Sequence, residues 1–121
     1  MREKLTTRDL EEAVEAIASM ISKAEKVIAK FRAGSPQHSL QRNRLAALKT
    51  ALQLIHRELS ATSEDVPTAA ELQQARAAIA SLISKSEKAQ QKLTPGTWQH
   101  RMLEANLKAL YIALHLLDRA I

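Results

Sequence analysis

The sequence contains no cysteine, so disulfide bonds, thiolate nucleophiles and zinc sites with thiolate ligands are excluded. Glycine and proline are scarce, with two and three residues, and aromatic residues make up only 2% of the chain. Hydrophobic residues account for 45% and are mostly Leu, Ile and Ala, which form helices readily. The 121 residues give room for one domain with a core, and we expect a single helical domain over residues 1–121.

Long apolar runs are also lacking. The first residues do not have the apolar stretch of a signal peptide. The most apolar segment, residues 107–117, contains Lys108 and His115 and is too short to cross a bilayer. We therefore expect a cytoplasmic protein without membrane contact. The net charge of +5 permits a nucleic acid, an acidic protein or an anionic surface as partner and selects none of them.

One segment of the sequence occurs twice. The residues AIASMISK at positions 16–23 recur as AIASLISK at positions 78–85, an offset of 62. The same offset, carried on without a gap, pairs Gly34 with Gly96 and continues to the end of the chain. We interpret this as a tandem duplication, with repeat 1 at residues 6–59, a linker at 60–67 and repeat 2 at 68–121.

Each repeat predicts two helices joined by a tight turn. Apolar residues fall at alternating spacings of four and three, which places them on one stripe of a helix. A single hairpin cannot bury its own stripe, so we expect the two hairpins to close on each other. The prediction is an all-α four-helix bundle with up-down-up-down topology, both turns at one end and the linker at the other. The stripes of repeat 1 are Leu10, Val14, Ile17, Ile21, Ala24, Ile28 and Phe31, then Leu45, Leu48, Leu52, Ile55 and Leu59.

The ends of the predicted helices carry capping residues. Residues 6–9 (TTRD) and 68–71 (TAAE) match the capping box, in which a Thr and an acidic residue three positions later satisfy free backbone amides. Gly34 and Gly96 suit the left-handed position that ends a helix. The next residues, Ser35 and Thr97, are candidate N-caps of the second helix in each repeat.

A Gln-His pair follows each cap. His38 and His100 lie at the third position of a predicted helix, where they could pack against the turn, contact a partner or bind an anion. A metal site would want a further ligand one helical turn away. Glu104 stands at that spacing after His100, but Arg42 stands there after His38. We therefore expect no metal and no cofactor, and a structural or partner-binding role for these pairs.

Basic residues gather toward the predicted turns. Lys26 and Lys30 recur as Lys88 and Lys92, and Arg42 and Arg44 follow the first turn. Cations at helix ends complement the helix dipole and keep a surface soluble, which is the simpler interpretation. The alternative is contact with phosphate groups at a basic end of the bundle. Trp98, in the second turn, either anchors a partner or folds back over its own hairpin.

The last predicted helix is apolar nearly all round, because Ile112 and Leu116 flank its main stripe. Such a helix is either central in the bundle or covered by a second molecule, and we expect a homodimer through these two residues. No constellation for catalysis is present. Glu-x-x-His pairs, glycine-rich phosphate loops and serines with a base partner are all absent from the sequence, and we predict that the protein is not an enzyme.

Two stretches of repeat 2, residues 83–90 and 96–100, together with residues 107–110, resemble an uncharacterised family of small bacterial helical proteins. Repeat 1 is similar to it through residues 34–38. The resemblance implies a bacterial, cytoplasmic context and supplies no functional residues, because the family has no assigned activity.

These observations predict a non-catalytic helical module that contacts a macromolecular partner through the basic turn end. The alternatives are a nucleic-acid-binding protein that uses the same end and a purely structural homo-oligomer. The predicted partner-binding residues are Gln37, His38, Trp98, Gln99, His100, Lys26, Lys30, Lys88, Lys92, Arg42 and Arg44.

Overall fold

The computed structural model of the chain describes residues 5–60 and 66–121, and it consists of four helices. The middle of the predicted linker, residues 61–65, lies outside the described residues. No strand occurs within the described ranges, and the prediction of an all-α four-helix fold is confirmed. The helices are α1 (Thr7–Ile28), α2 (Pro36–Ser60), α3 (Ala69–Gln91) and α4 (Trp98–Ala120).

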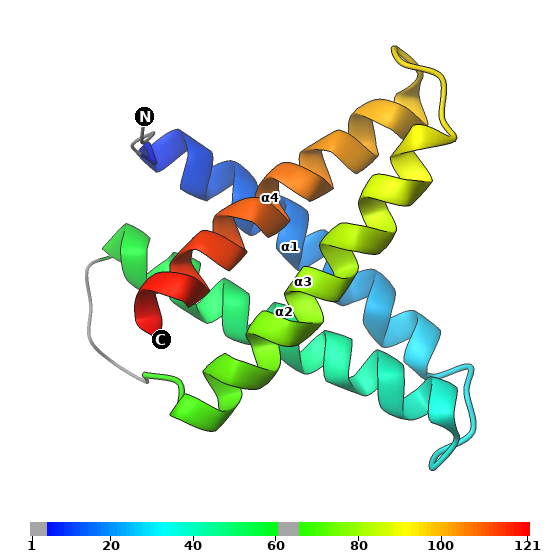
Figure 1. Ribbon diagram of the computed structural model, residues 1–121, viewed down its shortest axis with the longest axis horizontal. Coiled ribbons are helices and arrows are strands. Elements are labelled where there is room, and N and C mark those ends of the chain that lie inside the picture. The colour runs from blue at the N-terminus through cyan, green and yellow to red at the C-terminus, as the bar shows by residue number, and fades with distance from the viewer. Residues whose placement is uncertain (1–4, 61–65) are drawn as a thin grey trace.

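The two hairpins cross each other instead of running side by side. In Figure 1 the α1–α2 hairpin runs from upper left to lower right, and the α3–α4 hairpin from lower left to upper right. The helices alternate in direction and both turns lie on the same side, as predicted. Because the hairpins cross, however, the two turns occupy separate corners of that side.

Contacts between helices follow from this crossing. Helix α4 packs against α1, α2 and α3, whereas α1 and α3 do not touch each other in the described part of the chain. Leu54 and Leu116, which are 62 positions apart, line the same pocket where α2 meets α4. The α1–α4 contact is likewise the counterpart of the α2–α3 contact. Equivalent positions therefore meet at the centre, as in a two-fold arrangement.

The core is built on part of the predicted apolar stripes: Leu10, Ile17, Leu48 and Ile55 of repeat 1 are buried, whereas stripe residues close to the first turn, such as Ile28, are only half-buried. Its largest fully buried side chains are Ile17, Ile55, Ile79, Leu110 and Leu117, drawn from all four helices. Each buried side chain of this size contributes about 1.5–3 kcal/mol to the free energy of unfolding. Small residues fill the places between them, and they are Ala13, Ala47, Ala51, Ala75, Ala109 and Ala113.

Ile112 and Leu116, the residues expected to contact a second copy, lie inside this core. Their side chains are 6% and 5% exposed. Helix α4, like α2, contacts all three other helices. The part of α4 that contains Ile112 and Leu116 is therefore covered by the chain itself, and the expected homodimer stays a prediction.

The capping boxes at the starts of α1 and α3 are confirmed. The backbone N–H of Asp9 donates to Thr6 Oγ1 at 3.0 Å, and the N–H of Thr6 donates to the Asp9 carboxylate at 3.1 Å. Thr68 and Glu71 make the same two bonds at 3.1 and 2.9 Å. Each pair satisfies two backbone amides that the helix itself leaves free.

Gly34 and Gly96 have the expected left-handed backbone, with φ of +88° and +91°, but they do not end the helices. Helix α1 already ends at Ile28. Gly34 is the third residue of a β-turn in which the N–H of Ser35 donates to the carbonyl of Arg32 at 3.1 Å. A positive φ at this position is what a type II turn requires. The glycines therefore shape the turn that leads into the N-caps.

Candidate functional site

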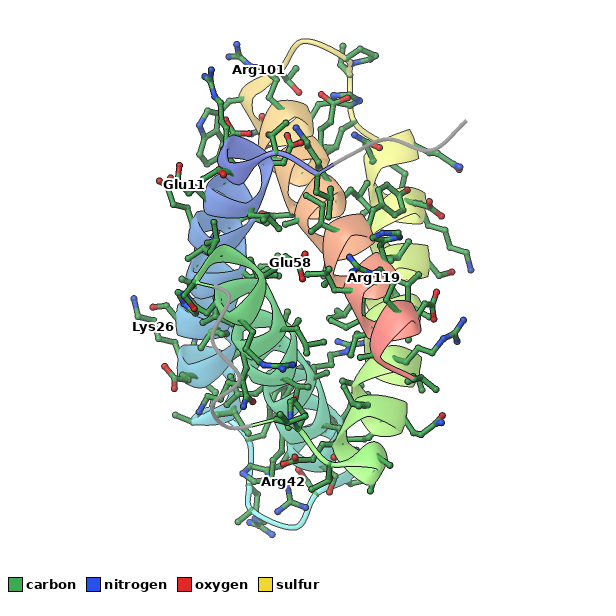
Figure 2. All side chains as sticks on the ribbon, turned by 90° about the vertical axis from the view of Figure 1, so that its left-hand side faces the viewer. Glu11, Lys26, Arg42, Glu58, Arg101 and Arg119 are labelled. Atoms are coloured by element: carbon green, nitrogen blue, oxygen red, sulfur yellow. The ribbon has the colours of Figure 1, made fainter. Side chains whose placement is uncertain are left out.

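The predicted partner-binding residues do not form one site. Figure 2 places Arg42, near the first turn, and Arg101, near the second, at opposite ends of the molecule. The crossing of the hairpins produces this separation. We call the first group the first-turn surface, and it consists of Lys26, Lys30, Gln37, His38 and Arg42. The second-turn surface consists of Lys88, Lys92, Trp98, Gln99 and His100.

Positive charge is concentrated around the first turn. Residues 23–44 contain six Lys and Arg against a single acid, Glu25, whereas residues 85–106 contain four against two. Lys26, Lys30 and Arg42 are exposed. The first-turn surface therefore has the stronger attraction for an anion.

Several cations away from the turns are paired with carboxylates of other helices. Lys108 Nζ lies 3.3 Å from Asp9, Lys49 Nζ lies 3.7 Å from Glu25, and Arg119 is paired with Glu58 at 3.7 Å. By contrast, no described carboxylate pairs with a cation of the first-turn surface. The charge of this surface is therefore not neutralised by a described ion pair.

The helix dipole accounts for only part of this charge. Lys26 stands in the last turn of α1, where the negative end of the dipole favours a cation. Arg42 stands in the second turn of α2, near the positive end, and the first turn of α2 has no acidic residue to offset it. The stabilisation of helix ends therefore explains Lys26 and leaves Arg42 without a structural reason.

The two Gln-His pairs belong to the helix starts. The backbone N–H of His38 donates to Ser35 Oγ at 3.1 Å, and that of His100 donates to Thr97 Oγ1 at 3.3 Å, so both predicted N-caps are confirmed. The two imidazoles are half-buried at separate turns. No group of three His, Asp or Glu side chains suited to a metal ion occurs in residues 5–60 and 66–121.

Trp98 does not fold back over its hairpin. It is the first residue of α4 and is 64% exposed. Met102, one turn later on the same face, is half-buried. An exposed Trp is suited to anchor a partner, but it belongs to the second-turn surface and lies far from the main positive charge.

Two grooves, which the sequence analysis missed, lie between helices of different hairpins. The first, about 470 Å³, runs between α1 and α4, and we call it the acidic groove because Asp9, Glu12 and Glu15 line it. The second, about 260 Å³, runs between α2 and α3. We call it the arginine groove, and its lining includes Leu40, Asn43, Arg44, Gln74, Ala77 and Ser81.

The grooves occupy equivalent places in the two-fold arrangement but differ in charge. Every residue that lines the arginine groove has its counterpart, 62 positions away, in the lining of the acidic groove. Glu12 and Glu15 of the acidic groove correspond to Gln74 and Ala77 of the arginine groove. A comparison of the two repeats at the positions where they differ would have pointed to this contrast. A third position also differs in charge, because the acidic groove has the neutral Asn106 where the arginine groove has Arg44.

The central charged group is paired in one groove and unpaired in the other. In the acidic groove Lys108 Nζ lies between Asp9, at 3.3 Å, and Glu12, at 3.8 Å. In the arginine groove the Nη2 atom of Arg44 is buried without a hydrogen-bond acceptor, and the described residues give Arg44 no ion pair. A buried polar group left without a partner costs about 1–3 kcal/mol.

The pKa of Asp9 is lowered from its ordinary value of 3.8. The largest cause is the hydrogen bond from the Thr6 backbone, followed by the Thr6 side chain and Lys108. All of these interactions favour the charged carboxylate. The edge of the acidic groove therefore stays negative well into the acidic range.

Comparisons with protein-family models, curated proteins and solved structures find no match for this chain. The resemblance to a bacterial helical family therefore stays a prediction. In the part of the chain that the structure describes, no helix has an apolar stretch long enough to cross a membrane.

Proposed function

We propose that this protein is a non-catalytic helical interaction module that contacts an acidic protein partner through its first-turn surface. One observation carries the proposal. Lys26, Lys30 and Arg42 are exposed and make no ion pair with a described carboxylate, whereas Lys49, Lys108 and Arg119, farther from the turns, are paired across helices. Unpaired charge of one sign around a rigid turn is suited to attract and orient a partner of opposite charge.

The internal repeat of the sequence supports this proposal, because it supplies two turns of similar shape and different charge. The first turn has six cations against one acid, and the second has four against two. We therefore propose that the first turn binds the partner and that the second, which carries the exposed Trp98, has a different contact.

The test is fluorescence anisotropy with three labelled probes, which are an acidic peptide, single-stranded RNA and duplex DNA, at low and physiological salt. The variant Lys26→Glu/Lys30→Glu should weaken binding of the acidic peptide by at least about tenfold, the scale of one to two lost charge contacts. Its matched control is Lys88→Glu/Lys92→Glu, which makes the same charge change at equivalent positions of the second turn. Equal losses in both variants, or no binding of the acidic peptide, would contradict the proposal.

Nucleic-acid binding through the same surface is the second candidate. Lys23, Lys26 and Lys30 lie at spacings of three and four along one face of α1, and all three are exposed. Such a row can follow a phosphate backbone. If this candidate holds, DNA or RNA should bind more tightly than the acidic peptide, with affinity that falls steeply as salt rises.

A further inference from the structure

We propose that the arginine groove is the docking site for an acidic amphipathic helix of the partner protein. The inference rests on the proposed function and extends it from an electrostatic contact to a defined binding mode. The partner's apolar side chains would lie against Leu40, Ala77 and Ala78, and one of its carboxylates would meet Arg44.

The shape of the groove suits a helix. On the α3 side it is lined by Gln74, Ala77, Ala78 and Ser81, whose spacing of three and four places them on one face of the helix. Ala77, Ala78 and Ser81 have short side chains, so a third helix can approach the α3 backbone closely beside them. Gln74 is longer, and its side-chain amide donates to the Asn43 carbonyl of α2 at 3.5 Å. The volume of about 260 Å³ is below the roughly 300–1,000 Å³ of small-molecule sites. The groove therefore accommodates single side chains of a docked segment.

Leu40 supplies apolar surface that the chain itself leaves partly uncovered. It is 44% exposed, although it lies one helical turn before Arg44 on the same face of α2. An aliphatic side chain from a partner would cover Leu40 and the alanines of α3 together. A helix that is apolar on one face and acidic beside it matches this combination.

Arg44 supplies the charge. Its Nη2 atom is buried without an acceptor, and the side chain has no hydrogen bond or ion pair with the described residues. Turning the guanidinium into the groove toward a carboxylate therefore breaks no existing hydrogen bond. A guanidinium can donate two parallel hydrogen bonds to one carboxylate, which fixes the orientation of the bound segment as well as its affinity.

The acidic groove shows why the occupant should be acidic and not basic. It has the same position in the fold, but Glu12 and Glu15 stand where the arginine groove has Gln74 and Ala77. An acidic helix would be repelled there and accepted in the arginine groove. The arginine groove begins on the same helix as Arg42, near the first turn, but Arg42 is two positions from Leu40 and from Arg44 and lies on another face of α2.

The experiment titrates the isotopically labelled protein with a 15-residue peptide that carries Leu at helical spacings of three and four and Glu on the flanking positions. A peptide of the same composition with shuffled Leu positions is the control. The amphipathic peptide should change the backbone amide chemical shifts of residues 40–44 and 74–81. The shuffled peptide should change them to a much smaller extent. RNA and duplex DNA serve as competing probes.

Two substitutions copied from the acidic groove test the assignment. Arg44→Asn and Ala77→Glu should each weaken binding of the amphipathic peptide by at least about tenfold, as expected for a lost or opposed charge contact. Ala77→Gln is the matched control, because it adds a side chain of the same size without the charge and should lose much less. Circular dichroism of each variant verifies that the fold is retained.

The outcomes separate this inference from the proposed function. If Arg44→Asn and Ala77→Glu bind the peptide as the wild type does while Lys26→Glu/Lys30→Glu does not, the groove is wrong and the first-turn surface stands. If the groove variants lose binding and the first-turn variant does not, the groove stands and the proposed surface is wrong. Binding of DNA or RNA with no binding of the acidic helix overturns the inference.

Discussion

Lys108 Nζ lies 3.3 Å from a carboxylate oxygen of Asp9, and this ion pair joins the middle of α4 to the first turn of α1. Asp9 also completes the capping box with Thr6. One carboxylate therefore serves the start of a helix and the contact between two hairpins, so its charge state should influence the stability of the fold.

The contribution of Asp9 to stability should depend on pH. Its pKa is lower in the folded chain than the ordinary value of 3.8, chiefly because of the Thr6 hydrogen bonds. A group of this kind stabilises the fold above its unfolded pKa, and the stabilisation disappears as the pH falls through its folded pKa. Urea unfolding should show Asp9→Asn less stable than the wild type at pH 7, with a difference that shrinks below about pH 4. A difference that does not change with pH would contradict this assignment.

A charge at Ile112 should destabilise the monomer. The side chain is 6% exposed in the chain's own core. An unpaired carboxylate buried there costs several kcal/mol. Ile112→Glu should therefore lower the urea midpoint strongly and equally at low and high protein concentration, whereas Gln99→Glu, at an exposed position of the same helix, should change it little. A midpoint that depends on concentration in the wild type would instead point to a second copy on this face.

Gly34→Ala should destabilise the fold by about 1–2 kcal/mol, because an L side chain rarely adopts a positive φ. No atom lies within 4 Å of the place where a Cβ would be, so the cost comes from the backbone alone. Gly34→Asn should cost less, since Asn tolerates the left-handed region better. Chemical unfolding of both variants measures the difference, and equal losses would argue against backbone strain as the cause.

The only tyrosine of the chain reports on the contact between α3 and α4. The hydroxyl of Tyr111 donates to the Glu87 carboxylate, and this hydrogen bond is the main reason that the pKa of Tyr111 is raised above 10.0. Glu87→Gln removes the negative charge and should bring the pKa down toward 10.0. An ultraviolet titration of tyrosinate absorbance in both proteins gives the comparison directly. An unchanged midpoint would show that the two side chains do not interact in solution.

The helices and their starts could be predicted from the sequence because the signals are local. The stripe that contains Ile17 and the capping box at Thr6 each depend on residues within a few turns of the same helix. The crossing of the hairpins could not be predicted in this way. It depends on where small side chains let helices approach, and buried alanines such as Ala51 and Ala113 look like ordinary helix formers in the sequence.

The same limit applies to the candidate site. The sequence identifies the basic residues, but their division between two corners follows from the crossing. It also gives no sign that Arg44 lies in a groove without a partner, since this depends on how α3 packs against α2. Positions at which the two repeats differ are the ones most informative about such contacts between helices. Arg76 stands where repeat 1 has Val14, and the structure pairs it with Asp118 of α4.

Leu54 and Leu116 line the same pocket where α2 crosses α4, so equivalent positions of the two hairpins lie together. This arrangement has a consequence for how the sequence of such a molecule can evolve. If the two hairpins were separate, identical chains, every substitution would enter both grooves at once, and the grooves would remain alike. Within one polypeptide each groove is free to acquire its own residues. Arg44 and Asn106 could then become different, and a symmetric framework could hold two binding surfaces of opposite charge.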